Sequence, residues 1–154
     1  MITDDTYPKT LINTARVARL ATVDLEYKPH LVPVVFVYDN NRDFYFIPID
    51  EKTKRSRPEN LKRVSNIKEN PNVALLIDEY NEDWTKLYFI IIHGKASIIG
   101  GKKKLDQNEM SFLKKAHKSL RNKYPQYKKI GVGEHVIMIM PQKMIAWKND
   151  KVNG

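Results

Sequence analysis

The sequence predicts one mainly β domain with some helix, an antiparallel β-barrel with helices packed on its outside. Six segments of strand length are apolar or alternate between apolar and polar residues. The first three follow one another through short turn clusters, without the crossover helices that a parallel sheet needs. A chain of 154 residues, 42% of them hydrophobic, is long enough to bury one core, so we expect a single domain over residues 1–154.

The first part of the chain is expected to form a short helix and then a meander of three strands. Thr6 shortly before Pro8 is typical of a helix start, because threonine caps free backbone N–H groups and proline fits the first turn. The clusters between the strands are rich in the polar residues that favour turns. The helix and the three strands are expected at residues 6–14, 17–24, 29–39 and 44–49.

The second of these strands carries an imidazole, His30, and a proline, Pro33. Proline has no N–H to donate to a strand ladder. Pro33 therefore indicates the edge of a sheet, a bulge, or a place where something other than a strand approaches the backbone.

Residues 50–71 combine many cations with the pattern of a capped helix. Ser56 and Glu59 fit a capping box, and apolar residues then recur at helical spacing. Cations near a helix N-terminus oppose the helix dipole unless an anion lies among them, so the segment is either a phosphate site or a solvated basic loop. The cations are Lys52, Lys54, Arg55, Arg57, Lys62 and Arg63.

The rest of the chain is expected to form two strands, a long helix and a closing strand. The first of these strands is apolar almost throughout, which favours burial on both of its faces. Gly94 inside the second indicates a bulge or a close backbone contact, and Pro141 is expected to break the closing strand. The elements are expected at residues 73–80, 86–99, 105–122, and 134–140 with 144–147.

Composition narrows the class of partner. The chain has 27 Lys and Arg against 18 Asp and Glu, a net charge of +9, which favours an anionic partner such as a phosphorylated cofactor, a nucleic acid or an anionic membrane surface. It contains no Cys, its first residues do not have the pattern of a signal peptide, and no apolar run approaches membrane-spanning length. We therefore expect a soluble cytoplasmic protein that does not insert into a membrane.

The sequence shows no catalytic constellation. Its four histidines, His30, His93, His117 and His135, lack metal-ligand spacing, so we expect surface or hydrogen-bonded histidines and no metal site. No nucleophile motif and no phosphate-binding glycine loop is present. No residue is assigned a catalytic role, and an enzyme built from this chain would take its chemistry from a bound cofactor.

Four stretches resemble one known family. They are ARVARLATVD at residues 15–24, KPHLVPVVF at 28–36, ENPNVALLIDEYNEDW at 69–84 and GKAS at 94–97. They resemble the pyridoxamine 5′-phosphate oxidase-like FMN-binding split barrels, and more closely their coenzyme F-420-dependent (deazaflavin) oxidoreductase branch. The resemblance implies a six-stranded antiparallel split β-barrel that forms a homodimer, with FMN or coenzyme F-420 at the subunit interface.

The resemblance also implies which residues bind the cofactor. Arg63 matches the phosphate-binding cation of the family, with Lys62 beside it and Lys54 in the basic loop before it. The second strand would lie along the ring and ribityl chain, the end of the third strand would flank the phosphate, and an aromatic residue would close the last strand. These residues are Leu31, Val32, Pro33, Val34, Val35 and Phe36 in the second strand, Ile47 and Pro48 in the third, and Trp147 in the last.

Departures from the family pattern argue against oxidation of vitamin B6. Leu31 and Phe36 stand where pyridoxamine phosphate oxidases present Arg and Lys, and Phe89 stands where they hold Gln. Their substrate-binding Arg has no counterpart after Trp147. The long basic loop before Arg63 would suit a cofactor with an extended anionic tail, as F-420 has.

Three functions remain open from the sequence. The first is a flavin- or deazaflavin-dependent oxidoreductase that moves hydride to or from a small unsaturated substrate. The second is a non-catalytic binder of flavin or haem, with His30 or His93 as the candidate axial ligand. The third is a nucleic-acid-binding module that uses Lys102–Lys104 and the basic helix up to Lys129, with Tyr124 and Tyr127 as stacking residues. The sequence favours the first and disfavours nucleic acid.

Overall fold

A single curled sheet of seven strands forms the protein, in the hydrogen-bonded order β2-β1-β5-β6-β7-β4-β3. The structure is a computed structural model that describes residues 6–50 and 61–149. The strands are β1 (Ala18–Val23), β2 (Pro29–Val34), β3 (Val37–Asp39), β4 (Phe44–Pro48), β5 (Asn72–Glu79), β6 (Tyr88–Ile99) and β7 (Val136–Lys148). The helices are α1 (Thr6–Thr14), α2 (Lys62–Glu69), the 3-10 turn η3 (Trp84–Lys86), α3 (Gln107–Lys123) and α4 (Gln126–Ile130).

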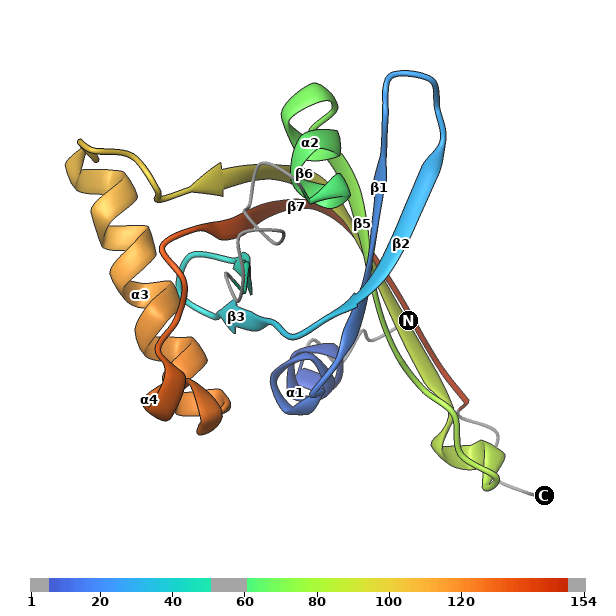
Figure 1. Cartoon of the computed structure of the whole chain (residues 1–154). Helices are drawn as coiled ribbons and strands as arrows, with labels where there is room; N and C mark the ends of the chain where they lie inside the picture. The colour runs from blue at the N-terminus through green and yellow to red at the C-terminus, as the bar shows by residue number, and fades with distance from the viewer. Residues whose placement is uncertain (1–5, 51–60, 150–154) are drawn as a thin grey trace.

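Every neighbouring pair of strands is antiparallel, as expected, and the sheet curls into a barrel that its ladder does not close. The two ends of the strand order, β2 and β3, are consecutive in the chain and are joined only through Val35 and Phe36. Figure 1 shows the chain passing from β2 into β3 across this opening. The fold is therefore the split barrel that the sequence predicts.

The prediction of six strands is wrong at one place. The expected strand over residues 29–39 is two strands, because β2 pairs with β1 whereas β3 pairs with β4 at the other end of the sheet. The chain leaves β1 after Val34 and pairs again only from Val37, with β4. Pro33 lies in β2, the strand at one end of the order, which agrees with the first of the three alternatives that Pro33 left open, the edge of a sheet.

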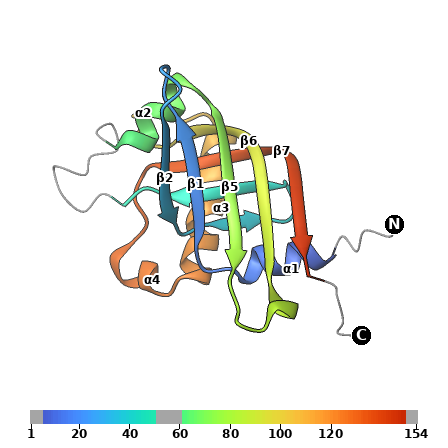
Figure 2. The same cartoon turned by 90° about the vertical axis from the view of Figure 1, so that its right-hand side faces the viewer.

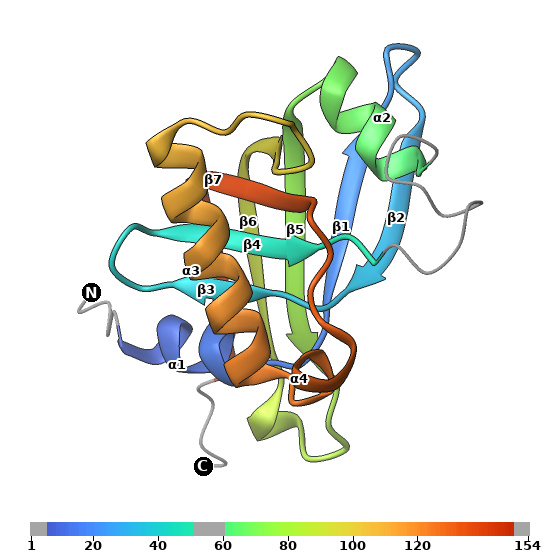
Figure 3. The ribbon, with the colours of Figure 1, turned by 60° about the vertical axis from the view of Figure 1, so that its left-hand side comes forward.

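The inward faces of the strands form the main core. Alternate residues of β1, β5 and β6, such as Leu20, Leu75 and Ile90, are fully buried in this core. The helices α1 and α2 add Ile12 and Val64 to it. A second core lies between α3, α4 and the strands behind them, and Figure 3 shows α3 crossing the outside of β3 and β4.

One face of β5 is open, which corrects the prediction that both of its faces are buried. Its residues alternate between buried and partly exposed, with Leu75 and Ile77 inside and Ala74 and Leu76 outside. The outward side chains are apolar without being covered, because the described helices pack elsewhere. Figure 2 looks onto this face, with α3 behind the strands.

The long pair β6–β7 contains the bulge that Gly94 predicts. The register shifts between His93 and Gly94, where His93 pairs with Lys143 and Gly94 pairs with Pro141. Gln142 is the extra residue, so β7 continues through Pro141 and the predicted break is wrong. A side chain at Gly94 would collide with the carbonyl of Met140, and only glycine allows this close approach.

The helix ends are partly as predicted. The first helix ends at Thr14, as expected. The helix α2 begins at Lys62, with Leu61 at its N-cap position and no side-chain cap. The predicted capping residues Ser56 and Glu59 lie outside the described residues. Within the described part of the chain, no helix is both long and apolar enough to cross a membrane.

The substitution Gly94→Ala should destabilise the protein, because its methyl group would meet the Met140 carbonyl across the bulge. Overpacking of this kind costs roughly 1–3 kcal/mol of unfolding free energy, which urea unfolding would measure. Ser97→Ala, at an exposed position of the same strand, is the control and should change stability little. Equal stability of Gly94→Ala and the parent would contradict the close approach.

Candidate functional site

A pocket of about 240 Å³ opens where the end of β2, the end of β4 and the start of α2 meet. Most of its wall is apolar, and its charged groups are one cation and one carboxylate, Arg63 and Asp50. The remaining lining residues are Val17, Pro33, Val34, Val35 and Pro48.

Arg63 is the unusual residue of this pocket. Its Nε is buried and has no hydrogen-bond partner among the described residues. Burial lowers the pKa of the Arg63 guanidinium, and the neighbouring Asp50 carboxylate opposes that shift. An arginine keeps its charge even so, and a buried N–H of a charged group without a partner is costly. The geometry therefore favours an anion with acceptor oxygens beside Arg63.

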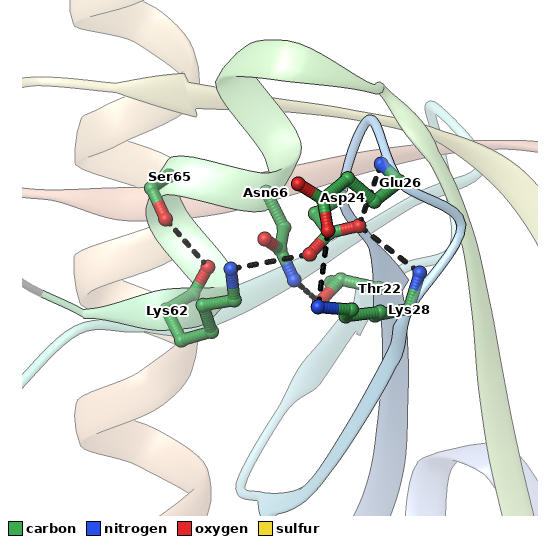
Figure 4. A network of polar contacts seen from close by, with 7 residues as sticks. All are labelled: Thr22, Asp24, Glu26, Lys28, Lys62, Ser65 and Asn66. Atoms are coloured by element: carbon green, nitrogen blue, oxygen red, sulfur yellow. Dashed lines mark hydrogen bonds and ion pairs between the residues drawn. The ribbon is translucent and has the colours of Figure 1, made fainter.

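The β1–β2 hairpin holds the start of α2 in place through Asp24. Its carboxylate accepts hydrogen bonds from the backbone N–H groups of Lys28 (3.0 Å) and Glu26 (2.8 Å), and an ion pair from Lys62 Nζ (3.4 Å). These donors, the Lys28 N–H first, lower the pKa of Asp24 despite partial desolvation. Figure 4 shows the group. Lys62 is thus directed to the hairpin, while the next residue lines the pocket.

A buried hydrogen bond fixes the middle of α2 to the same hairpin. Asn66 Nδ2 donates to Thr22 Oγ1 at 3.0 Å, and both side chains are buried (Figure 4). Arg63 lies one helical turn before Asn66, so this bond sets the rotation and height of the turn that carries the guanidinium. This contact could not be predicted from the sequence, because no local pattern pairs two polar residues that are so far apart along the chain.

Five of the residues predicted from the family resemblance come together in this pocket. They are Pro33, Val34, Val35, Pro48 and Arg63. Sequence reasoning missed Asp50 and Val17, which complete the wall. The Tyr127 hydroxyl donates a hydrogen bond to Asp50 Oδ1 at 3.0 Å and so helps to position that carboxylate. A carboxylate directly after the third predicted strand was the only available hint of Asp50.

The other predicted residues do not line the pocket. Val32, Phe36 and Ile47 pack in or against the core, and Leu31 is exposed on the outward face of β2. Lys54 lies outside the described residues. Trp147 lies on the distal part of β7, where its ring stacks on Phe89 with centroids 5.6 Å apart. Trp147 therefore does not contribute to the Arg63 pocket of its own chain.

The tyrosines proposed for nucleic-acid stacking are not available for it. Tyr124 and Tyr127 are 9% and 6% exposed, in the core beneath α3. Burial and the Asp50 carboxylate raise the pKa of Tyr127, so it stays a neutral donor. Without exposed aromatic residues among its cations, this helix lacks the stacking platform that the nucleic-acid interpretation requires.

The histidines differ from the expectation at one position. His117 Nε2 is 3.0 Å from the Gly133 carbonyl, as expected for a hydrogen-bonded histidine. His30 faces the barrel side of β2, opposite the buried Thr22, and its Nδ1 is buried and has no hydrogen-bond partner among the described residues. Over residues 6–50 and 61–149, no group of three His, Cys, Asp or Glu side chains is arranged to hold a metal ion.

Three larger cavities lie beside α1, with volumes of about 340, 380 and 450 Å³. In two of them a carboxylate is bonded within the protein. Arg19 Nη1 donates to Asp78 Oδ1 at 2.7 Å in the cavity of 450 Å³, and the Tyr38 hydroxyl donates to Asp43 Oδ1 at 2.7 Å in the cavity of 380 Å³. The smaller pocket at Arg63 is the one with an unsatisfied buried donor, and it is the candidate functional site.

Comparisons with known proteins identify the class. Residues 8–148 match the pyridoxamine 5′-phosphate oxidase family, described as "Pyridoxamine 5'-phosphate oxidase", and the match covers most of the chain. The chain therefore belongs to this family of split barrels. A search of curated protein sequences found no match.

Solved structures share the fold at low sequence identity. The conserved hypothetical protein Rv2991 of Mycobacterium tuberculosis is 15% identical, with a TM-score of 0.69 over 100% of this chain and 94% of that one. HutZ, the haem storage protein of Vibrio cholerae, is 12% identical (TM-score 0.64, 96% and 95% covered). An FAD-binding protein of Mesorhizobium loti, mll6688, is 13% identical (TM-score 0.64, 94% and 92% covered). The neighbours thus include both flavin- and haem-binding proteins.

Thr22→Val should weaken the attachment of α2, because it keeps the shape of Thr22 but leaves the buried Asn66 amide without its acceptor. Losing one partner of a buried hydrogen bond costs roughly 1–3 kcal/mol, measurable by urea unfolding. The control is Lys68→Ala on the exposed side of the same helix, which should be close to neutral. If Thr22→Val were as stable as the parent, the bond would not anchor the helix.

Proposed function

We propose that this protein binds a flavin-type cofactor, FMN or the deazaflavin coenzyme F-420, in the Arg63 pocket and acts as an oxidoreductase on a small unsaturated substrate. The observation that carries the proposal is the buried Arg63 Nε without a partner in a pocket that the end of β2 walls. Family membership and the flavin-binding neighbour support the same class of ligand. The absence of Cys from the sequence is compatible with the reducing cytoplasm, where we expect it to work.

The residues present fit a phosphorylated flavin. Arg63 would bind the phosphate, and the N–H groups of Lys62 and Arg63 could join it, because among the described residues no side chain caps α2 and its first turn holds no acidic residue. Among the described residues β2 pairs with β1 alone, so its other edge has no strand partner there and its backbone could bond a planar ring. When bound, the cofactor would supply the hydride chemistry. The chain's own residues bind it, orient it and exclude water.

Haem is the second candidate, favoured by the likeness to HutZ and by the unpaired Nδ1 of His30. This histidine faces the interior of the barrel at the other end of β2 from Val34. His93, the other candidate axial ligand, is exposed on the open face of β6. Flavin remains the better proposal because the unsatisfied group of the pocket is a cation, which suits a phosphate.

We also propose that the protein is a homodimer with the cofactor at the subunit interface. The open face of the sheet carries a row of outward residues in register across β5, β6 and β7, namely Leu76, Ile91 and Ile145. Leu31 and Pro33 of β2 lie on the same face beyond Ala21 and Arg19 of β1, where Arg19 is paired with Asp78, and Leu31 is 68% exposed. A largely apolar face of this kind is typical of an interface. A second copy would cover it beside the Arg63 pocket.

Arg63→Ala should weaken binding of FMN and of F-420 without unfolding the protein. Loss of the charge-assisted hydrogen bonds to phosphate should cost roughly 1.5–3 kcal/mol, or about ten- to a hundredfold in affinity. Arg63→Lys should recover part of the loss, since a point charge still attracts phosphate. Fluorescence titration of the purified protein with each cofactor measures these changes, and a parallel titration with haemin tests the second candidate.

Lys104→Ala, in an exposed basic cluster away from the pocket, is the matched control and should leave both affinities unchanged. We expect F-420 to bind more tightly than FMN, because further cations precede Arg63 in the sequence. Binding of haemin in place of both flavins would overturn the proposed function. If Arg63→Ala bound FMN and F-420 as tightly as the parent, the proposal that Arg63 binds the phosphate would be wrong.

Ile91→Glu should convert the proposed dimer to a monomer, because it places a charge at the centre of the apolar row. Sedimentation velocity at micromolar concentration measures the change. Met110→Glu, an equally drastic change at a 43% exposed position of α3, should leave the dimer intact. A monomeric parent protein would refute the proposed interface.

A further inference from the structure

The hydrogen-bonded ladder between β1 and β2 ends two residues before Arg16 and Phe36, which the same register would set opposite each other. Its last pair on this side is Ala18 with Val34. The phenol of Tyr124, at the end of α3, occupies this position instead. Its hydroxyl accepts a hydrogen bond from the Phe36 N–H (3.2 Å) and lies 2.8 Å from the Arg16 carbonyl.

Lys123 supplies the second of the two hydrogen bonds that the backbone of Phe36 would otherwise make in a strand ladder. The Tyr124 hydroxyl has a single proton, and the Arg16 carbonyl (2.8 Å) is nearer to it than the Phe36 carbonyl (3.1 Å). The Phe36 carbonyl receives its own donor from Lys123 Nζ at 3.0 Å. Tyr124 and Lys123 together thus satisfy both backbone groups of Phe36, at the junction where the chain leaves β2 for β3.

Further contacts of Arg16 and Lys123 hold the same three segments together. Arg16 Nη2 donates to the Lys123 carbonyl at 2.9 Å, and its guanidinium lies 4.6 Å from the centre of the Tyr124 ring. The ammonium of Lys123 lies 4.0 Å from the centre of the Phe36 ring. These contacts join the start of β1, the junction after β2 and the end of α3 into one unit.

We propose that Tyr124 and Lys123 form a wedge that holds the start of β1 apart from the end of β2 and thereby sets the width of the Arg63 pocket. Val17 and Val35, the immediate neighbours of Arg16 and Phe36, are wall residues of that pocket. The two wedge residues are positioning residues: they act through the backbone and do not line the pocket. The consequence for cofactor binding rests on the function proposed above, whereas the wedge itself does not.

The charge state of Lys123 should modulate the wedge. Burial, and then the nearby Arg16 guanidinium, lower the pKa of Lys123 to about 8. The described groups that face it or stand behind it are Arg16, the Tyr124 phenol and, beyond that ring, Tyr127 with Asp50. A charged ammonium is a stronger donor to the Phe36 carbonyl than a neutral amine. The wedge should therefore loosen as pH rises through about 8.

The lowered pKa of Lys123 affects the stability of the whole protein in the opposite direction: stability rises with pH, whereas the wedge loosens. In the unfolded chain Lys123 holds its proton up to its ordinary pKa of 10.5, whereas the folded protein releases it near 8. The unfolded state then binds more protons between these values, so this residue makes stability rise with pH across that window. Lys123→Met should lack this contribution. Urea unfolding of parent and variant at pH 7, 8.5 and 10 measures the difference.

The binding experiment uses Lys123→Met and Tyr124→Phe, with Lys118→Met on the exposed side of α3 as the matched control. Both wedge variants should bind FMN and riboflavin roughly three- to tenfold more weakly, and the control should bind both normally. Riboflavin lacks the phosphate, so Arg63→Ala should affect FMN alone. The parent's affinity for both ligands should fall between pH 7 and 9, and this fall should be absent in Lys123→Met. Unchanged affinities in both wedge variants would overturn the positioning role.

Hydrogen exchange of the free protein tests the wedge without any cofactor. The peptide that contains Val35 and Phe36 should exchange faster in Tyr124→Phe and Lys123→Met than in the parent and in Lys118→Met. If the parent binds neither flavin, the proposed function is wrong, and hydrogen exchange alone then tests whether Tyr124 and Lys123 hold this part of the backbone. Unchanged exchange at this peptide in both variants would show that they do not.

Discussion

The structure depends on how a seven-stranded antiparallel sheet closes on itself without a closing ladder. The strands β2 and β3 end the hydrogen-bonded order, and the chain joins them through Val35 and Phe36 alone. The β1–β2 ladder ends at Ala18 and Val34, so the backbone groups of Phe36 in this connection must find other partners. Side chains from the end of α3 bond them, and the Arg63 pocket lies beside this connection.

The pocket combines a well-anchored frame with an unsatisfied group. The Asn66–Thr22 bond and the Asp24 contacts hold α2 against the hairpin, and this places the helical turn that carries Arg63 beside the pocket. A buried donor without a partner costs stability in the free protein. Such a cost is typical of a binding site, where the ligand provides the missing acceptor. This is the physical reason to place the ligand here instead of in the larger cavities beside α1.

Membership of the family defines the fold more narrowly than the chemistry. The structural neighbours share the barrel at 12–15% identity, and they include a haem storage protein and an FAD-binding protein. One fold can host different ligands because the ligand is chosen by side chains at the opening of the barrel. In the site proposed for this chain the side chains are a cation, a carboxylate and an apolar wall. In the proposed homodimer, the second subunit would contribute the remaining groups.

The elements with local signals could be predicted from the residues alone. Alternation and helical spacing predicted most of the strands and helices, Gly94 predicted its bulge, and Pro33 left an edge as one of three alternatives, because each depends on residues within a few positions. The family resemblance also pointed to Arg63. The tertiary structure was needed to find the break at Val35 and Phe36, which depends on pairing with strands at opposite ends of the sheet. It likewise separated the role of Arg63 from that of Lys62, since which of two adjacent cations faces the pocket follows from the rotation of α2 that a distant threonine fixes.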